Sequence, residues 1–223
     1  MNILPIAYVK TEIKGKFGVP RQSGRVKSLL GEIIFYPPYN DADAVRDIEQ
    51  FSHLWLIFDF SLNHKDAFSP LVRPPRLGGN KKVGVFASRS SFRPNNLGLS
   101  CVKLEKVIKN GNTFSLLVSG VDLADGTPIY DVKPYLNFSD AIPDAKCGYA
   151  EENKDHLLKV VFDEKIFLDF PKDKLPTLIG CIAEDPRPSY QNDDRVYAIT
   201  YLNFDVSFTV SGDVATIIGV KKL

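Results

Sequence analysis

LSCVKLEKVIKNGNTFSLLVSGV, residues 99–121, consists of two apolar runs separated by a turn. The runs Leu99–Ile108 and Phe114–Val121 carry β-branched and other large apolar residues, which favour strands. Between them, the Asn110-Gly111 pair tolerates positive φ, as a tight hairpin turn requires. The stretch therefore predicts two antiparallel strands joined directly to each other.

Similar short apolar runs flank this hairpin on both sides. They are Glu32–Tyr36, Leu54–Phe60, Val83–Ala87 and Ile129–Tyr135. Turn residues separate the runs, so an antiparallel barrel or sandwich is favoured over a doubly wound fold. One short helix is expected after Asn40-Asp41, which can cap it, and this helix could plug a barrel end.

The remainder of the chain predicts a smaller α/β unit. The composition becomes more acidic after Pro143, and we place the domain boundary there, giving domains 1–143 and 144–223. A helical face recurs at Leu175, Leu178, Ile179 and Ile182, before Pro186 and Pro188. Further strands are expected at Leu157–Phe162, Lys165–Phe170, Val196–Leu202, Phe204–Val210 and Val214–Val220. The expected class is thus mainly β, with a small antiparallel barrel and an α/β appendage.

Composition and motifs exclude several classes of protein. Three cysteines, Cys101, Cys147 and Cys181, are an odd number and far apart, so neither a disulfide framework nor a zinc site is indicated. No G-x-G-x-x-G, P-loop, H-E-x-x-H or G-x-S-x-G motif occurs. Without a leader-like N-terminus or a long apolar stretch, we expect a cytoplasmic protein that needs no metal.

The net charge of +1 hides a basic stretch. Residues 65–93 contain seven basic residues and a single acidic one. Such a stretch could bind a polyanion, and it could equally be a solvated loop face.

The most unusual segment is GVFASRSSFRPNNLGLS, residues 84–100. Arg89 and Arg93 stand four residues apart beside three serines, a pattern that suits bidentate binding of a carboxylate or phosphate. A rigid Pro-Asn turn with surface arginines is the structural alternative.

This segment resembles the GVFATRSxFRPNPxGxS signature of the tRNA N6-threonylcarbamoyladenosine methyltransferase family, known as TrmO, TsaA or YaeB. Further ordered segments match the same family, so the resemblance covers nearly the whole chain. They are Val19–Gln22, Phe51–Leu56, Val72–Gly79, Asp122–Tyr135 and Glu184–Tyr190. The sequence departs from the family pattern at Asn96, where a proline is usual; asparagine frees a backbone N–H and loosens φ.

The resemblance implies a homodimer whose barrel domain binds S-adenosyl-L-methionine and whose smaller C-terminal domain helps to engage tRNA. The methyl acceptor would be N6 of threonylcarbamoyladenosine next to the anticodon. Carried over position by position, the expected cofactor contacts are Pro20, Arg21, Gln22, Ser61, Leu62, Arg89, Leu99, Asp125, Gly126, Thr127 and Pro128. An arginine can clamp the cofactor's carboxylate, Leu62 and Leu99 can wall its adenine, and Asp125 can face its cationic sulfur.

Methyl transfer can rely on positioning, so no general base is obligatory. By residue type, Asp125, Tyr130, Asp131 and His64 are candidates for a base. A structural role, such as Asp125 and Asp131 bonding the backbone in turns, fits each of the four at least as well. Trp55 lies within an apolar run and is expected in the core rather than as a stacking platform.

Basic and aromatic residues supply the expected tRNA contacts. They are Lys65, Arg73, Arg76, Lys81, Lys82, Arg93, Arg187 and Tyr190. Arg187 and Tyr190 could instead pack the C-terminal unit against the barrel. Two other functions remain open at this point: a non-catalytic RNA-binding β-barrel, or a methyltransferase acting on a small molecule.

Overall fold

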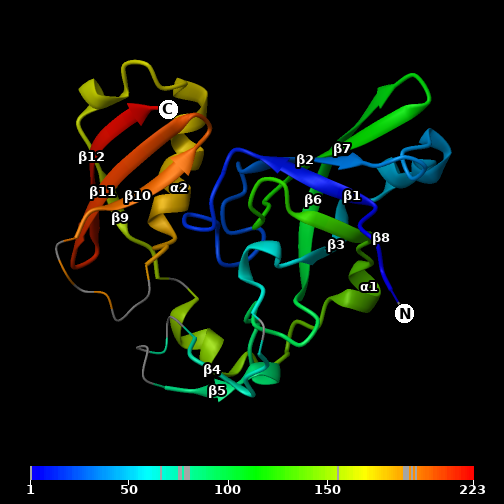
Figure 1. Cartoon of the computed structure of the whole chain (residues 1–223), viewed down its shortest axis with the longest axis horizontal. Coiled ribbons are helices and arrows are strands. Elements are labelled where there is room, and N and C mark those ends of the chain that lie inside the picture. Colours follow the sequence, from blue (N-terminus) through cyan, green and yellow to red (C-terminus); the bar gives the residue numbers. More distant parts are fainter. Residues whose placement is uncertain are drawn as a thin grey trace.

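Six antiparallel strands close into a barrel in the computed structural model, which describes residues 2–65, 67–74, 77, 81–154, 156–187, 191, 193 and 195–223. Around the barrel the order is β1-β2-β7-β6-β3-β8 (Figure 1). The strands are β1 Ala7–Thr11, β2 Leu30–Phe35, β3 His53–Asp59, β6 Leu97–Asn110, β7 Thr113–Ser119 and β8 Pro128–Pro134. The predicted mainly β class with a small antiparallel barrel is thereby confirmed.

The hairpin at the centre of the sequence forms as predicted. Asn110 pairs with Thr113 across the turn, and Gly111 has φ +59°. Sequence reasoning missed β1, and it predicted a strand over 83–87 where β5 covers only Val83–Gly84. That short strand pairs with β4, Leu71–Val72, and the chain then turns into the 3-10 helix η5, Val85–Ala87.

The helix predicted after Asp41 is two 3-10 turns instead. Asp41 caps η1, Ala42–Val45, by accepting a hydrogen bond from the Asp43 N–H. Asp47 then adopts φ +67°, which interrupts the helix before η2, Ile48–Gln50. Val45 is buried, so the segment still covers part of the barrel core.

A four-stranded sheet with one α-helix forms the C-terminal part. Its strand order is β10-β11-β12-β9, and β9 runs parallel to β12. The strands are β9 Lys159–Val161, β10 Tyr197–Tyr201, β11 Phe204–Ser211 and β12 Val214–Lys222, and the predicted helix is α2, Leu175–Ala183. The remaining helical segments are η3 Ser61–Asn63, α1 Asn137–Asp140, η6 Gly148–Asn153, η7 Glu164–Phe167 and η8 Lys172–Lys174.

The strand predicted over 165–170 is wrong, because η7 lies there. Asp163 caps η7 through the Lys165 N–H, and the turn buries Phe167 and Phe170 beside each other. Among the described residues, no helix is both long and apolar enough to cross a bilayer.

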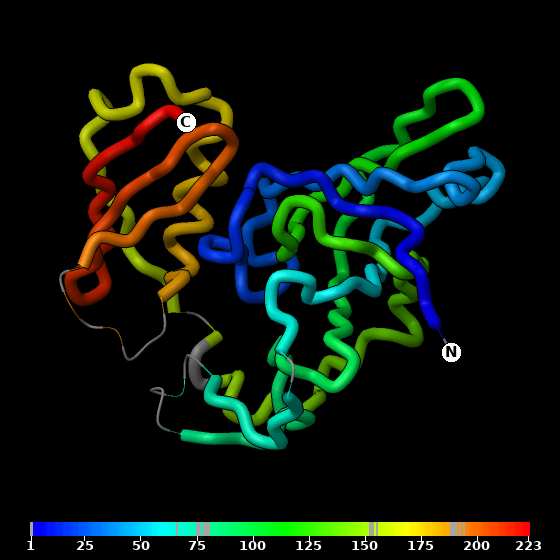
Figure 2. The backbone as a smooth tube through the Cα atoms, viewed as in Figure 1, coloured from blue at the N-terminus to red at the C-terminus, as the bar shows by residue number. Residues whose placement is uncertain are grey.

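The two parts pack along α2, which lies between the C-terminal sheet and the barrel (Figures 1 and 2). Thr177 Oγ1 donates to Ser28 Oγ over 2.9 Å, and the methyl groups of Val26 lie against Gly180. Arg25 Nε donates to both carboxylate oxygens of Glu184, at 3.0 and 3.1 Å. Residues 25–28, which lead into β2, therefore fix the position of the C-terminal part.

Candidate functional site

A cavity of about 660 Å³ lies against the outward-facing side of β3 and the start of β6. Along β3, Leu54 and Leu56 point into the barrel and are fully buried, whereas Trp55 and Ile57 point outward and line the cavity. Across from them on β6, Cys101 pairs with Trp55 and Leu99 pairs with Ile57. The outward side of two adjacent strands thus forms an apolar wall.

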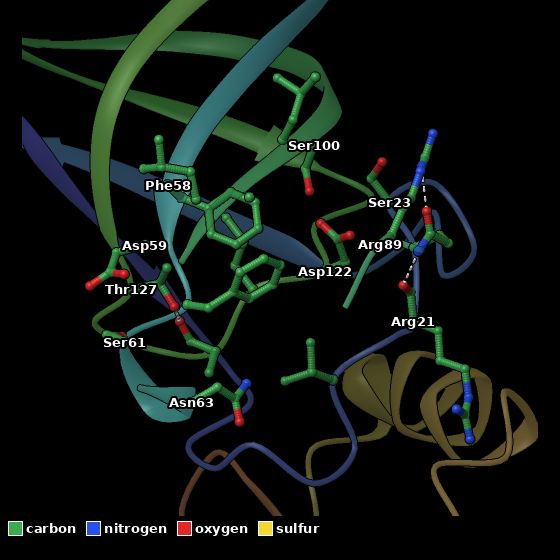
Figure 3. Close-up of a pocket in the computed structure, with 18 of the residues that line it drawn as sticks. Arg21, Ser23, Phe58, Asp59, Ser61, Asn63, Arg89, Ser100, Asp122 and Thr127 are labelled. Atoms are coloured by element: carbon green, nitrogen blue, oxygen red, sulfur yellow. Dashed lines mark hydrogen bonds between the residues drawn. The ribbon is translucent and has the colours of Figure 1, made fainter. Parts of the chain in front are cut away.

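Two polar loops border this wall. In the first loop, Gln22 Nε2 donates to the Arg21 carbonyl, and Arg89 of the second loop donates to Gln22 Oε1 (Figure 3). Arg21 also donates to the carbonyl oxygens of Asp185 and Arg187 beyond α2. A chain of hydrogen bonds therefore joins the C-terminal part to Arg89 at the cavity.

The segment 84–100 is held together by its own polar side chains. Arg93 donates to the carbonyls of Val85 and Ser88, at 3.2 and 2.9 Å. Asn96 has φ +49°, a conformation that proline cannot adopt, and its backbone N–H donates to the Arg93 carbonyl. The departure from the family pattern therefore has a structural use, because both freedoms that asparagine brings are exploited.

The electrostatics of the cavity are mixed. Its lining includes four basic side chains, those of Lys16, Arg21, Arg89 and Arg93, and two carboxylates, those of Asp59 and Asp122. His64 Nε2 lies 2.8 Å from Asp59 Oδ1. Burial raises the pKa of Asp122 to about 6, although hydrogen bonds from Ser100 and the Ser23 backbone and the nearby Arg89 partly offset the burial.

Two buried acceptor oxygens of the lining lack hydrogen-bond partners among the described residues. They are Asn63 Oδ1 and Asp122 Oδ1. Buried acceptors are almost always paired in folded proteins, so two such atoms in one cavity indicate polar groups kept for a ligand.

Most of the predicted cofactor contacts come together here. Those that line the cavity are Pro20, Arg21, Gln22, Ser61, Leu62, Arg89, Leu99 and Thr127. Asp125, Gly126 and Pro128 are not among the lining residues. Asp125 instead accepts hydrogen bonds from the Thr11 N–H at 2.8 Å and from Lys14 Nζ at 2.9 Å.

The four candidate bases lie outside the described lining of the cavity. Asp131 accepts a hydrogen bond from the Val132 N–H and pairs with Lys133. Tyr130 lies close enough to Asp59 for the negative charge to add to burial in raising its pKa. These contacts match the structural alternative for Asp125 and Asp131.

The predicted tRNA contacts are spread more widely. Lys65, Arg73, Lys81 and Lys82 are exposed, and Arg93 is half-buried in the cavity wall. Arg187 is 7% exposed and paired with Asp185 through Nε at 2.8 Å, a position that fits the packing alternative. Arg76 and Tyr190 lie outside the described residues.

Several lining residues escaped sequence reasoning. They are Lys16, Ser23, Trp55, Ile57, Asn63 and Asp122. Trp55 was expected in the core, but it is half-buried and its Nε1 donates to Asp140 Oδ2 over 2.8 Å. The alternation of Leu54 and Leu56 with Trp55 was the signal that could have placed it outward.

Comparisons with known proteins find matches over most of the chain. The family model for the tRNA-methyltransferase O N-terminal domain matches residues 8–141, and that for the TrmO C-terminal domain matches residues 157–223. The tRNA (adenine(37)-N6)-methyltransferase of Escherichia coli strain K12 is 43% identical over 216 residues, covering 92% of each chain.

A putative S-adenosylmethionine-dependent methyltransferase, RcsF, of Pseudomonas aeruginosa is 36% identical over 92% of this chain and 90% of its own. The crystal structure of TrmO from Pseudomonas aeruginosa superposes with a TM-score of 0.76 at 29% identity, covering 99% of this chain and 98% of that one.

Proposed function

Because this chain belongs to the tRNA-methyltransferase O family, we propose that it transfers a methyl group from S-adenosyl-L-methionine to N6 of adenine-37 in tRNA. We propose further that the accepted base carries a threonylcarbamoyl group, as the resemblance implies. The observation that carries the proposal is the cavity, because loops 20–22 and 88–93, which hold two of the family's sequence motifs, meet there around a polar chamber.

The residues present fit this cofactor. A volume of about 660 Å³ lies within the range of small-molecule sites, and the outward side of β3 and β6 offers an apolar surface for an adenine ring. Arg89 is exposed at the cavity and suits the carboxylate of an amino-acid group. When bound, the cofactor supplies an activated methyl group on a cationic sulfur.

The contribution of the chain to catalysis is mainly positioning. Trp55, Ile57 and Leu99 supply an apolar surface on one side of the cavity, and the Arg21–Gln22–Arg89 hydrogen bonds hold the polar side. Holding a donor and an acceptor in line can supply most of the rate enhancement of a displacement reaction. No strong base is required at the cavity for this proposal.

The wider assignments are proposals as well. The barrel, 1–143, would bind the cofactor, and residues 144–223 would help to engage tRNA together with the exposed Lys65, Arg73, Lys81 and Lys82. Exposed Leu62 and Leu99 at the cavity rim support a homodimer that covers this region. We place the protein in the cytoplasm, where tRNA would be met, and light scattering after gel filtration tests the dimer.

The decisive experiment is mass spectrometry of tRNA nucleosides after incubation with purified protein and S-adenosylmethionine. We expect threonylcarbamoyladenosine to gain one methylene mass, and Arg89→Ala to abolish the gain. Arg46→Ala is the matched control, because Arg46 is exposed, pairs with Asp43 and lies outside the cavity lining. RNA binding without any gain would favour the non-catalytic module, and methylation of a small molecule alone would favour the other alternative.

A further inference from the structure

Among the described residues, Asp122 is the lining carboxylate that forms no salt bridge with a basic side chain. The other lining carboxylate, Asp59, is hydrogen-bonded to His64. Asp122 follows β7, and its side chain lies near Ser100, Ser23 and Arg89 (Figure 3). Its Oδ1 is buried without a hydrogen-bond partner among the described residues.

A buried carboxylate with one oxygen lacking a hydrogen-bond partner is costly to the fold. Burial disfavours its charged form, and a buried charge is normally retained only where something compensates it. Asp122 as a whole is half-buried and lines the cavity. A cationic group on the ligand would supply the missing compensation.

The position of Asp122 next to Arg89 narrows the choice of cation. An α-amino acid carries its ammonium and carboxylate groups on one carbon, so an anionic and a cationic side chain lying side by side can bind both groups. Arg89 is the charged side chain that acts on Asp122 through space. Arg89 itself donates a hydrogen bond to Gln22 Oε1, and both Arg89 and Asp122 line the cavity.

We propose that Asp122 is the anionic partner of the α-ammonium group of the cofactor's methionine part, while Arg89 binds the α-carboxylate. This inference rests on the proposed function and specifies how the same site orients its cofactor. It adds a residue that was not among the expected contacts. Asp122 would be a binding residue rather than a base.

Two ligands separate this role from its alternatives. S-adenosylhomocysteine carries the amino-acid group on a neutral sulfur, and 5′-methylthioadenosine carries the same nucleoside without the amino-acid group. We expect Asp122→Asn to weaken S-adenosylhomocysteine roughly 10- to 100-fold in calorimetry, as the loss of a charge-assisted hydrogen bond predicts. Binding of 5′-methylthioadenosine should be unchanged, and Asp205→Asn on β11 should alter neither affinity.

Each other result would overturn the proposal in a recognisable way. Weaker binding of S-adenosylmethionine with unchanged S-adenosylhomocysteine would make Asp122 the partner of the sulfonium. An equal loss of affinity for S-adenosylhomocysteine and for 5′-methylthioadenosine would indicate that Asp122 has a purely structural role. Unchanged affinities with a fall in kcat would point to a base. Failure of the unmodified protein to bind any of the three ligands would instead remove the proposed function itself.

A second measurement needs no substitution. The carboxylate must be ionised to bind an ammonium group, and the pKa of Asp122 is about 6. Affinity of the unmodified protein for S-adenosylhomocysteine should therefore fall between about pH 7.5 and about pH 5, while affinity for 5′-methylthioadenosine stays level. A parallel decline for both ligands would contradict the assignment.

Discussion

Replacing Gly98 by alanine should damage the fold and the cavity together. Gly98 lies directly opposite Phe58 in the β3–β6 pairing. An added Cβ would stand 2.2 Å from Phe58 Cζ and 2.5 Å from Cε2, far inside van der Waals contact. The Phe58 ring is only 3% exposed and packs edge-on against Phe60 at 5.0 Å between centroids, so it has little room to move.

The size of the effect follows from overpacking. Forcing an extra methyl group into a close-packed core costs about 1–3 kcal/mol. For a chain of this length, 1 kcal/mol corresponds to about 2–4 °C, so the Tm of Gly98→Ala should fall by about 2–12 °C. Because Phe58 also lines the cavity, a displaced ring should weaken S-adenosylhomocysteine binding as well.

Thermal unfolding and calorimetry of three variants and the unmodified protein test this reasoning. Gly84→Ala is the control, because nothing lies within 4 Å of its added Cβ and its φ is −60°. Phe58→Leu in the Gly98→Ala background shortens the opposing side chain and should recover part of the lost binding. If Gly98→Ala melts and binds like the unmodified protein, the proposed contact between Gly98 and Phe58 is wrong.

Four further predictions concern other features. The pKa of Asp122 rises from 3.8 to about 6 on folding, so its contribution to the free energy of unfolding is lost, by about 3 kcal/mol, as the pH rises from 4 to above 6. The melting temperature of Asp122→Asn should therefore rise relative to that of the unmodified protein as the pH increases across that range. A difference in melting temperature that does not change with pH would refute the raised pKa of Asp122. Arg25→Ala should cost about 1–3 kcal/mol, because it removes the Arg25 Nε donor that both carboxylate oxygens of the buried Glu184 share. Lys103→Ala, at an exposed pair with Glu105, should cost under about 0.5 kcal/mol, and equal melting temperatures of the two variants would contradict the larger value for Arg25. Burial raises the pKa of Cys181 to about 12, so iodoacetamide should label exposed Cys147 in the folded protein and reach Cys181 only in denaturant, as peptide mass spectrometry would show. Trp55 is the single tryptophan and lines the cavity, so saturating S-adenosylhomocysteine should change its emission, and an unchanged spectrum at calorimetric saturation would argue against binding beside it.

Local patterns in the sequence predicted most of the strands, but they did not predict how the strands pair to close the barrel. The hairpin around Gly111 and the apolar runs of β2, β3 and β8 could be recognised because each carries its own signal. The pairing of β1 with β8, which closes the barrel, depends on residues more than a hundred positions apart. No local pattern carries that information.

The errors in secondary structure also have local causes. Ile166, Phe167 and Phe170 were assigned to a strand from their apolar character, although Asp163 ahead of them is an N-cap residue. The cap at Asp41 was identified, but the positive φ of Asp47 that interrupts the helix was not. In both cases backbone geometry outweighed side-chain propensity.

The residues of the candidate site that stand in sequence motifs could be predicted, whereas those that only the folded geometry brings to the cavity could not. Arg21, Gln22 and Arg89 stand in segments that resemble a known family, and they meet at the cavity. Asp122 and Asn63 attract attention only once burial leaves an oxygen of each without a partner. Asp125, expected near the cofactor, is occupied by Lys14 and Thr11 because the turn directs its side chain toward β1.

The alternation along β3 gives this protein two properties that mutation can adjust separately. Substitutions at Leu54 or Leu56 should lower the melting temperature, while substitutions at Trp55 or Ile57 should change the ligand affinity. The two kinds of position alternate along the same strand. An evolving or engineered lineage could therefore alter specificity without first acquiring spare stability, except at Phe58, which belongs to both sets. A saturation library over positions 54–57 should therefore separate into two phenotypes, one for the even and one for the odd residue numbers.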